Sequence, residues 1–193
     1  MQANKEIAMS IPKPFLVTAL VAALFMGMTG HEPAHGNGDP HLRVLATYDT
    51  GLGVNGAEII SVRHDGMAVL TNVAGSVDVL DLSDPAAPKL VRRVEIDVAD
   101  GTPNSVALHP HHDYFLVVVG RPGQVGKVLV YRLDRTLLAS AAAGIQPDSI
   151  AIAPNGQHGV VANEAEGTAI GNNGGDGSLL VVDLSGFNGK RPR

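Results

Sequence analysis

The stretch GIQPDSIAIAPNGQHGVVANEAEG, residues 144–167, carries the pattern on which the fold of this chain depends. A Pro-Asp pair is followed by the alternating run SIAIA, and Pro-Asn-Gly separates this run from a second apolar run, HGVVAN. Alternating apolar residues are typical of a β-strand, and Pro-Asn-Gly is typical of a tight turn. The stretch therefore predicts two antiparallel strands whose open ends carry polar and acidic residues.

The same pattern occurs twice more along the chain, in AEIISVRHDGMAVLTN (57–72) and PNSVALHPHHDYFLVVVG (103–120). Asn104 and Asp148 occupy the same place in successive units and are 44 residues apart, and the third strands of successive units are 51 residues apart. A repeat of about 40–50 residues with about four short strands is typical of a β-propeller blade. The sequence predicts an all-β fold of β-propeller-type, four-stranded antiparallel blades.

The predicted strands make two complete blades and a third that lacks its outer strand. They span 57–63, 67–72, 77–82 and 89–96; 104–109, 114–119, 127–133 and 136–141; and 148–153, 158–162 and 178–184. About three blades form an incomplete ring, because propellers typically have four to eight. We therefore expect a fragment of a longer protein; the alternatives are several chains in one ring, or a small non-propeller β-sheet protein. Residues 42–50 could supply the outer strand of a further blade, and no capping repeat is evident.

The predicted organisation has three parts. They are a signal peptide and polar tail (1–36), a propeller segment (42–186, with blades at about 57–96, 103–144 and 147–186) and a basic C-terminal tail (187–193).

The first residues resemble a secretory signal. Lys5 and Lys13 precede the apolar run FLVTALVAALFM (15–26), which is shorter than the roughly 20 residues of a membrane-spanning helix. We expect an N-terminal signal helix that is cleaved between Gly27 and Gly36, with an uncleaved anchor as the alternative. The protein is then exported: periplasmic, secreted or on the cell surface. Contact with the membrane is expected only through an uncleaved signal segment.

Composition narrows the function classes. Hydrophobic residues make up 45% of the chain and aromatic residues only 4%, so the core must consist of Val, Leu, Ile and Ala. The net charge of −5 argues against a nucleic-acid partner, which requires a basic surface. The chain contains no Cys, which excludes disulfides and thiol catalysis.

Several segments together resemble the choice-of-anchor I domain family. They are GAEIISV (56–62), VDVLDLSDPAAPKLV (77–91), TPNSVAL (102–108) and the stretch at 144–167. The resemblance covers roughly residues 42–186 and implies the N-terminal part of an exported β-propeller protein. Ala165 and Gly167 depart from the Gly and Pro of the family signature. The resemblance supplies no catalytic residue set, although some relatives carry phosphatase labels.

Strand direction predicts one polar rim. The start of each innermost strand and the end of the next strand lie at the same edge of a blade, with the turn between them at the opposite edge. We expect the rim to hold the following candidate ligand contacts: Glu58, Asn72, Asn104, Asp148, Asn163, Glu164 and Glu166. Their oxygen atoms suit Ca²⁺, although turn capping is the simpler role for Asp148 and Asn163. No cofactor is assigned beyond this suitability for Ca²⁺.

Two other motifs are candidates for a metal site and for a phosphate-binding loop. HPHHD (109–113) contains metal-binding residue types, but it aligns with the turns RHDG (63–66) and APNG (153–156) and is expected to be a solvated turn on the opposite face. GNNGGDGS (171–178) lacks the Gly-Lys-Ser/Thr of a phosphate loop and is expected to be a flexible loop.

The sequence favours a non-catalytic binding or cell-surface module whose partner is an unknown small molecule, glycan or protein. The alternative is a metal-dependent hydrolase, a phosphoesterase or lactonase, that uses the acidic rim. Arg121 is the one basic residue near the rim that could stabilise phosphate charge. Open blade faces also predict self-association.

Overall fold

The computed structural model describes residues 42–72, 74–165 and 176–190 of the 193-residue chain. In these ranges the structure consists of eleven β-strands and contains no helix. Residues 42–193 form one compact unit. The expected signal helix, its cleavage region and the last three residues of the basic tail lie outside the described residues.

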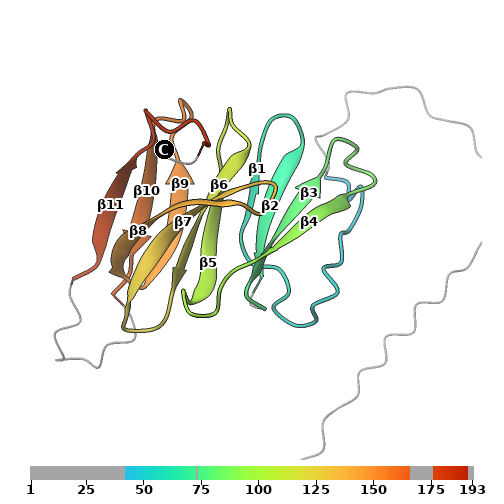
Figure 1. The fold of residues 1–193 in the computed structure, drawn as a ribbon. Coiled ribbons are helices and arrows are strands. Elements are labelled where there is room, and N and C mark those ends of the chain that lie inside the picture. Colours follow the sequence, from blue (N-terminus) through green and yellow to red (C-terminus); the bar gives the residue numbers. More distant parts are fainter. Residues whose placement is uncertain (1–41, 73, 166–175, 191–193) are drawn as a thin grey trace, which may run out of the picture. The chain divides into compact units, whose positions relative to one another are not determined.

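The strands form three antiparallel sheets in chain order (Figure 1). The first sheet contains β1 (Ile60–Val62), β2 (Met67–Asn72), β3 (Ser76–Asp81) and β4 (Lys89–Glu95). The second contains β5 (Thr102–Leu108), β6 (Tyr114–Gly120), β7 (Val125–Arg132) and β8 (Leu137–Ile145). The third contains β9 (Pro147–Ile152), β10 (His158–Asn163) and β11 (Ser178–Asp183).

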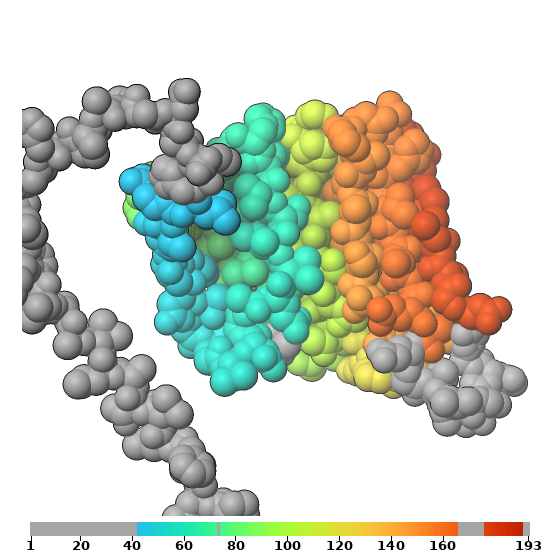
Figure 2. Space-filling model, turned by 180° about the vertical axis from the view of Figure 1, so that it is seen from behind, coloured from blue at the N-terminus to red at the C-terminus, as the bar shows by residue number. Residues whose placement is uncertain are grey.

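This arrangement confirms the predicted fold class. Each sheet is an up-and-down blade in which neighbours in sequence are neighbours in the sheet, and β1, β5 and β9 are the first strands of successive blades. The three blades lie side by side from the N-terminal to the C-terminal colours (Figure 2). In the described residues the third blade has three strands, with the order β11-β10-β9.

The stretch that opens the sequence analysis forms β9, a turn and β10. Val161 pairs with Ile150 on one side and with Leu180 on the other. The turn closes where the amide of Ala153 donates to the carbonyl of His158. Successive side chains of a strand point to opposite faces of the sheet, and this decides which of them are buried. Ile150 and Val161 face the second blade, whereas Ala151 and Ala162 are exposed.

The core lies between the blades, where each β-sheet face packs on the next. Between the first and second blades it is built mainly of Val and Leu with Phe115 and Tyr131. Between the second and third blades Tyr114, Leu116 and Val118 pack with Ile150 and Val161. Val117, Val118 and Val119 are completely buried because β6 is covered on both faces. The low aromatic content is thus compatible with a dense core.

The expectation of an outer strand at 42–50 is not met, because this segment contains no strand. It instead covers the face of the first blade that points away from the second. Tyr48 packs against the cluster of Ala68, Leu70 and Leu80, and its hydroxyl donates to Asp78 Oδ2 at 3.1 Å. The first blade therefore has a cap, which the pattern of the sequence does not predict.

Candidate ligand rim

Three equivalent residues converge on one pocket. In each blade a backbone hydrogen bond closes the turn after the innermost strand, and its donor is the amide of Arg63, His109 or Ala153. Glu58, Asn104 and Asp148 each lie five residues before the donor of their blade, so they occupy equivalent positions. All three of these polar residues line a single pocket of about 420 Å³, together with Thr102, Arg121 and Gln146. The structure therefore brings together residues that are 46 and 44 positions apart in the sequence. Their role as ligand contacts stays a prediction.

Charges of both signs line this pocket. Glu58 and Asp148 are exposed, so their carboxylates are accessible to a ligand. The guanidinium of Arg121 donates to the carbonyl of Val98, which places its positive charge at the pocket wall. The pocket thus offers carboxylate acceptors beside a cationic donor, rather than a purely acidic surface.

Asn104 also holds two blades together beside the pocket. Its Nδ2 donates to the carbonyl of Pro147 at 2.8 Å, which links β5 to the start of β9. The approach is close enough to require glycine, because a Cβ on Gly126 would lie 2.4 Å from Pro147 Cδ. The two blades are therefore fixed at the point where the pocket forms.

Asn72 and Asn163 serve the scaffold rather than the pocket. Asn72 is completely buried, and its amide accepts from the Ser76 amide and donates to the Ser76 hydroxyl across the β2–β3 turn. Asn163 is 4% exposed, accepts from the Gly144 amide at 2.9 Å and donates to Ser178 Oγ at 3.1 Å. The Asn72 bonds close the β2–β3 turn, whereas the Asn163 bonds join β10 to β11 and to β8 of the second blade. Neither side chain lines the rim pocket.

The acidic end of the opening stretch lies at the same edge. Asn163 pairs with Pro147, and the Glu164 amide donates to the carbonyl of Gln146, which lines the pocket. Glu166 lies outside the described residues. The other end of the hairpin, at Asn155 and Gly156, lines a separate pocket with His109. Among the described residues, Asp148, Asn163 and Glu164 therefore lie at one edge and the Pro-Asn-Gly turn lies at the other, while the predicted place of Glu166 stays a prediction.

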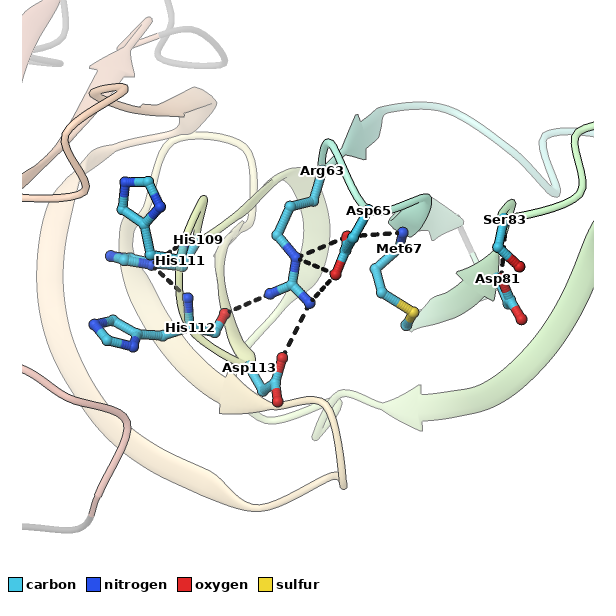
Figure 3. Close-up of polar contacts among 9 residues, drawn as sticks. All are labelled: Arg63, Asp65, Met67, Asp81, Ser83, His109, His111, His112 and Asp113. Atoms are coloured by element: carbon cyan, nitrogen blue, oxygen red, sulfur yellow. Dashed lines mark hydrogen bonds and ion pairs between the residues drawn. The ribbon is translucent and has the colours of Figure 1, made fainter.

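At this opposite edge a repeated contact joins each blade to the next. Arg63 Nη1 donates to the carbonyl of His112 at 2.9 Å, and Nη2 bonds Asp113 Oδ1 at 3.0 Å (Figure 3). His109, at the equivalent position of the second blade, places Nε2 3.0 Å from the carbonyl of Gly156. We call these two contacts the blade latches. Ala153 occupies the position in the third blade and has no polar side chain to continue the series.

The solvated turn expected at 109–113 needs correction for His109, whose exposed fraction is 3%. His109 Nδ1 accepts from the amides of His111 and His112, at 3.1 and 3.0 Å (Figure 3). Since Nδ1 accepts, the proton of the neutral ring resides on Nε2 and is donated to Gly156. Burial lowers the pKa of His109 below its usual value of 6.5, and the nearby positive charges act in the same direction. Sequence comparison placed the turn but could not show that its first side chain points inward.

Arg63 is held in place by a second carboxylate. Its guanidinium bonds Asp65, and this hydrogen bond lowers the pKa of Asp65 to about 2. The side chain of Arg63 is only 9% exposed. The sequence predicts this segment only as a turn, although the charge pattern Arg-His-Asp-Gly (63–66) is a signal for an ion pair there.

Comparison with known proteins now gives the family. The family model of the choice-of-anchor I domain matches residues 58–192, which is most of the chain. The chain belongs to the choice-of-anchor I domain family. The resemblance inferred from the sequence motifs is thereby confirmed, and this family suggests an exported or cell-surface protein.

One solved structure supports the fold of this choice-of-anchor I domain, and a second is similar at a lower level. Hydrazine synthase from Kuenenia stuttgartiensis has a TM-score of 0.52 with 16% sequence identity, over 67% of this chain and 34% of that chain. A nidogen/laminin complex has a TM-score of 0.46 with 13% identity, over 67% of this chain and 45% of that chain. The domain thus spans less than half of either chain, and at this identity the likeness to hydrazine synthase concerns the fold alone. No curated protein matches the sequence.

Within 42–72, 74–165 and 176–190, no group of three or more His, Asp or Glu side chains is placed to hold a metal ion. No helix in those ranges is long and apolar enough to cross a membrane.

Proposed function

We propose that this protein is an exported, non-catalytic binding module that holds a small ligand in the rim pocket. One observation carries the proposal: equivalent residues of three successive blades, Glu58, Asn104 and Asp148, line the same pocket. Loops and strand ends on a rigid β scaffold are common binding positions, because they vary while the sheets keep their geometry.

The lining indicates the chemistry of the ligand. The carboxylates of Glu58 and Asp148 accept hydrogen bonds from amine or hydroxyl donors, and Arg121 donates to an acceptor or anionic group. Ile59 and Pro122 supply apolar contact area. An amino sugar, or a basic peptide segment with its carbonyl groups, has this combination of donors, acceptors and apolar surface.

The same lining favours binding over catalysis. Hydrolysis requires a nucleophile or activated water, a base and charge stabilisation in one place. Among the described residues, those that line the rim pocket include no His or Ser, and the hydroxyl of Thr102 has no described imidazole beside it in the pocket to activate it. A metal-dependent hydrolase stays the alternative, since Arg121 could stabilise phosphate charge.

Calorimetry tests the binding proposal. Wild-type protein is titrated separately with glucosamine, trilysine and Ca²⁺, and the titrations are repeated with Glu58→Gln and Asp148→Asn. We expect an organic amine to bind the wild type and to bind each variant about tenfold more weakly, as for the loss of one charged hydrogen bond. Glu95→Gln, which changes an exposed carboxylate at the end of β4, is the matched control. Wild-type protein that binds none of the probes would contradict the pocket chemistry, and binding of Ca²⁺ alone would favour the metal alternative.

Export is tested separately. We expect protein recovered from the periplasm or medium to begin between Gly27 and Gly36, as measured by intact mass spectrometry. A full-length mass in that fraction would contradict cleavage and support a retained anchor.

A further inference from the structure

The turn between β5 and β6, residues 109–113, takes part in both blade latches (Figure 3). On one side it receives Arg63 of the first blade, which donates to the carbonyl of His112 at 2.9 Å and bonds Asp113 at 3.0 Å. On the other side it supplies His109, whose Nε2 lies 3.0 Å from the carbonyl of Gly156 in the third blade. A change in the conformation of this turn therefore affects two blade junctions at once.

The conformation of the turn depends on the protonation state of His109. Its Nδ1 accepts from the amide of His111 at 3.1 Å and from the amide of His112 at 3.0 Å. A protonated imidazole is a donor at both nitrogens and has no acceptor. A proton on Nδ1 would point at two backbone N–H groups, and both amides would lose their acceptor inside the protein. The folded turn is therefore incompatible with a charged ring.

The ring of His109 has no room to turn aside. Its exposed fraction is 3%, and it packs on the rings of Tyr114 and His112, with centroid distances of 4.5 and 4.7 Å. A Cβ on Gly156 would lie 2.6 Å from Nε2, so the third-blade turn also lies directly against the ring. Relief from a charged ring must come from movement of the backbone of the turn.

His112 links the two latches through its backbone. Its amide donates to the ring of His109, and its carbonyl accepts from Arg63 Nη1 and from the Tyr114 amide. The two peptide groups are planar and share the Cα of His112, so a rotation that removes the amide from Nδ1 also displaces the carbonyl. Loss of the ring contact therefore weakens the contact with Arg63.

We propose that residues 109–113 form an acid-sensitive switch, in which the uptake of one proton by His109 opens the turn and releases both blade latches together while the strands stay folded. The switch lies at the edge opposite the rim pocket, so it does not depend on the proposed function. In the closed state the ring is neutral, Nδ1 accepts and Nε2 donates. In the open state the ring carries the proton and is exposed to water.

The positive charges around the ring determine the direction of this response. Burial lowers the pKa of His109, and positive charge lowers it further; this charge comes from Arg63, His111 and His112. Tyr114 is neutral, because burial raises its pKa to about 12. The closed turn therefore resists the proton, and opening it returns the ring to its ordinary affinity for protons.

The other groups around the ring do not offset this effect. The carboxylates of Asp65 and Asp113 are both paired with Arg63. The third-blade turn and residues 184–188 line a pocket beside the ring, and the described residues of that lining outside the turn 109–113 carry no charge. Acidification is therefore expected to open the turn, and a return to neutral pH to close it.

NMR of the full-length, ¹⁵N-labelled chain tests the switch. Histidine nitrogen shifts follow the protonation of each ring, and amide hydrogen exchange reports which backbone hydrogen bonds open. We expect the amides of His111 and His112 to open about 30-fold more often at pH 5 than at pH 7.5, after correction for the intrinsic effect of pH, because an open ring titrates near 6.5. The amide of Val117 in β6 should stay protected, and in His109→Gln the corrected exchange of the turn should not depend on pH.

Asp113→Asn tests whether the two latches are coupled. The substitution removes one partner of Arg63, so the turn opens more easily and the pKa of His109 should rise by about 0.3, as expected for one exposed ion pair. Loss of a negative charge alone would lower this pKa. Asp84→Asn changes an exposed carboxylate between β3 and β4 and should leave the pKa of His109 unchanged.

These measurements can overturn the proposal in three ways. Exchange of the His111 and His112 amides that does not depend on pH would show that the turn does not open with the proton. Simultaneous loss of protection at Val117 would show global unfolding in place of a local switch. A pKa of His109 that Asp113→Asn lowers or leaves unchanged would show that the latches act independently.

Discussion

Arg63 and His109 perform the same task with different chemistry. Each follows an innermost strand, and each donates to the carbonyl of the residue at the same position in the next blade's turn, His112 or Gly156. The first uses a guanidinium that also bonds two carboxylates, and the second uses a buried neutral imidazole. A carbonyl can accept from either donor, so the repeat conserves the contact while its residue type changes.

Loss of the His109 side chain should destabilise the protein strongly. His109→Ala removes the bond to Gly156 and leaves the amides of His111 and His112 without their acceptor, so we expect a loss of about 2–3 kcal/mol in the free energy of unfolding. Urea unfolding monitored by circular dichroism measures this. His158→Ala, at an exposed position, is the control and should change stability by less than about 0.5 kcal/mol. Equal effects of the two substitutions would contradict the role of His109 as a latch.

The lowered pKa of His109 predicts a pH dependence of stability. The unfolded chain binds a proton near the ordinary pKa of 6.5, whereas the folded protein binds it only at lower pH. The contribution of His109 to the free energy of unfolding is therefore at its full value above pH 6.5. It is lost as the pH falls below 6.5 toward the pKa of His109 in the folded protein. His111, His112 and Arg63 add positive charge around the ring and act in the same direction.

To test this, the free energy of unfolding is measured at pH 7.5 and pH 5 for the wild type and for a variant without the imidazole. We expect His109→Gln to be less stable at pH 7.5 and to lose less stability than the wild type on acidification. A wild type and variant with parallel pH profiles would refute the assignment of the neutral ring.

At the scale of elements, residues 42–50 owe their position to a buried ion pair. The side chain of Asp78 is completely buried and bonds Arg93 at 2.6 Å, and Arg93 also donates to the carbonyl of Thr50. Tyr48 donates to the same carboxylate. The cap therefore rests on one polar cluster as well as on apolar contacts.

Removal of Arg93 should release this cap. Arg93→Ala leaves the Asp78 carboxylate buried without its cation, and we expect a loss of about 3 kcal/mol in the free energy of unfolding. Arg92→Ala, next on the same strand, should cost much less. Hydrogen exchange at residues 45–52 should accelerate in the first variant only; unchanged exchange there would show that the ion pair does not hold the segment.

The close approach of the second and third blades makes a prediction about glycine. A Cβ on Gly126 would lie 2.4 Å from both Pro147 Cδ and the carbonyl oxygen of Val119, so Gly126→Ala should cost about 1–3 kcal/mol through strain. Nothing lies within 4 Å of a Cβ on Gly186, so Gly186→Ala should have little effect. Thermal melts of the two variants compare them directly, and similar melting temperatures would contradict the packing at Pro147.

Periodicity predicted the strands well because a blade is a local repeat. The opening stretch predicts strands at 148–153 and 158–162, and the structure has Pro147–Ile152 and His158–Asn163. The cap at 42–50 was not predictable in this way, since it depends on the distant partners Asp78 and Arg93. Position in the repeat likewise predicted that Glu58 and Asp148 share an edge, but not that Asn163 is buried and bonded to Gly144 of the second blade.

At the scale of the whole molecule, three blades share their cores only with neighbours. Val69 and Val77 of the first blade pack with the second, and Ile150 and Val161 of the third pack with the second from its other side. The second blade is therefore covered on both faces, and its residues should exchange their amide hydrogens most slowly. The rim pocket depends on this order, because each blade contributes one of its three equivalent residues.

Spin-label distances test this central claim most directly, and the absence of cysteine makes the labelling specific. Two double variants are compared by electron double resonance: Glu58→Cys with Asp148→Cys, and Glu58→Cys with Asn155→Cys. The pairs are separated by 90 and 97 residues, so a chain without this fold would give nearly equal distances. The account predicts a clearly shorter distance for the first pair, because Glu58 and Asp148 line one pocket while Asn155 lies beyond the far end of β9. Equal distances, or a shorter distance to Asn155, would contradict it.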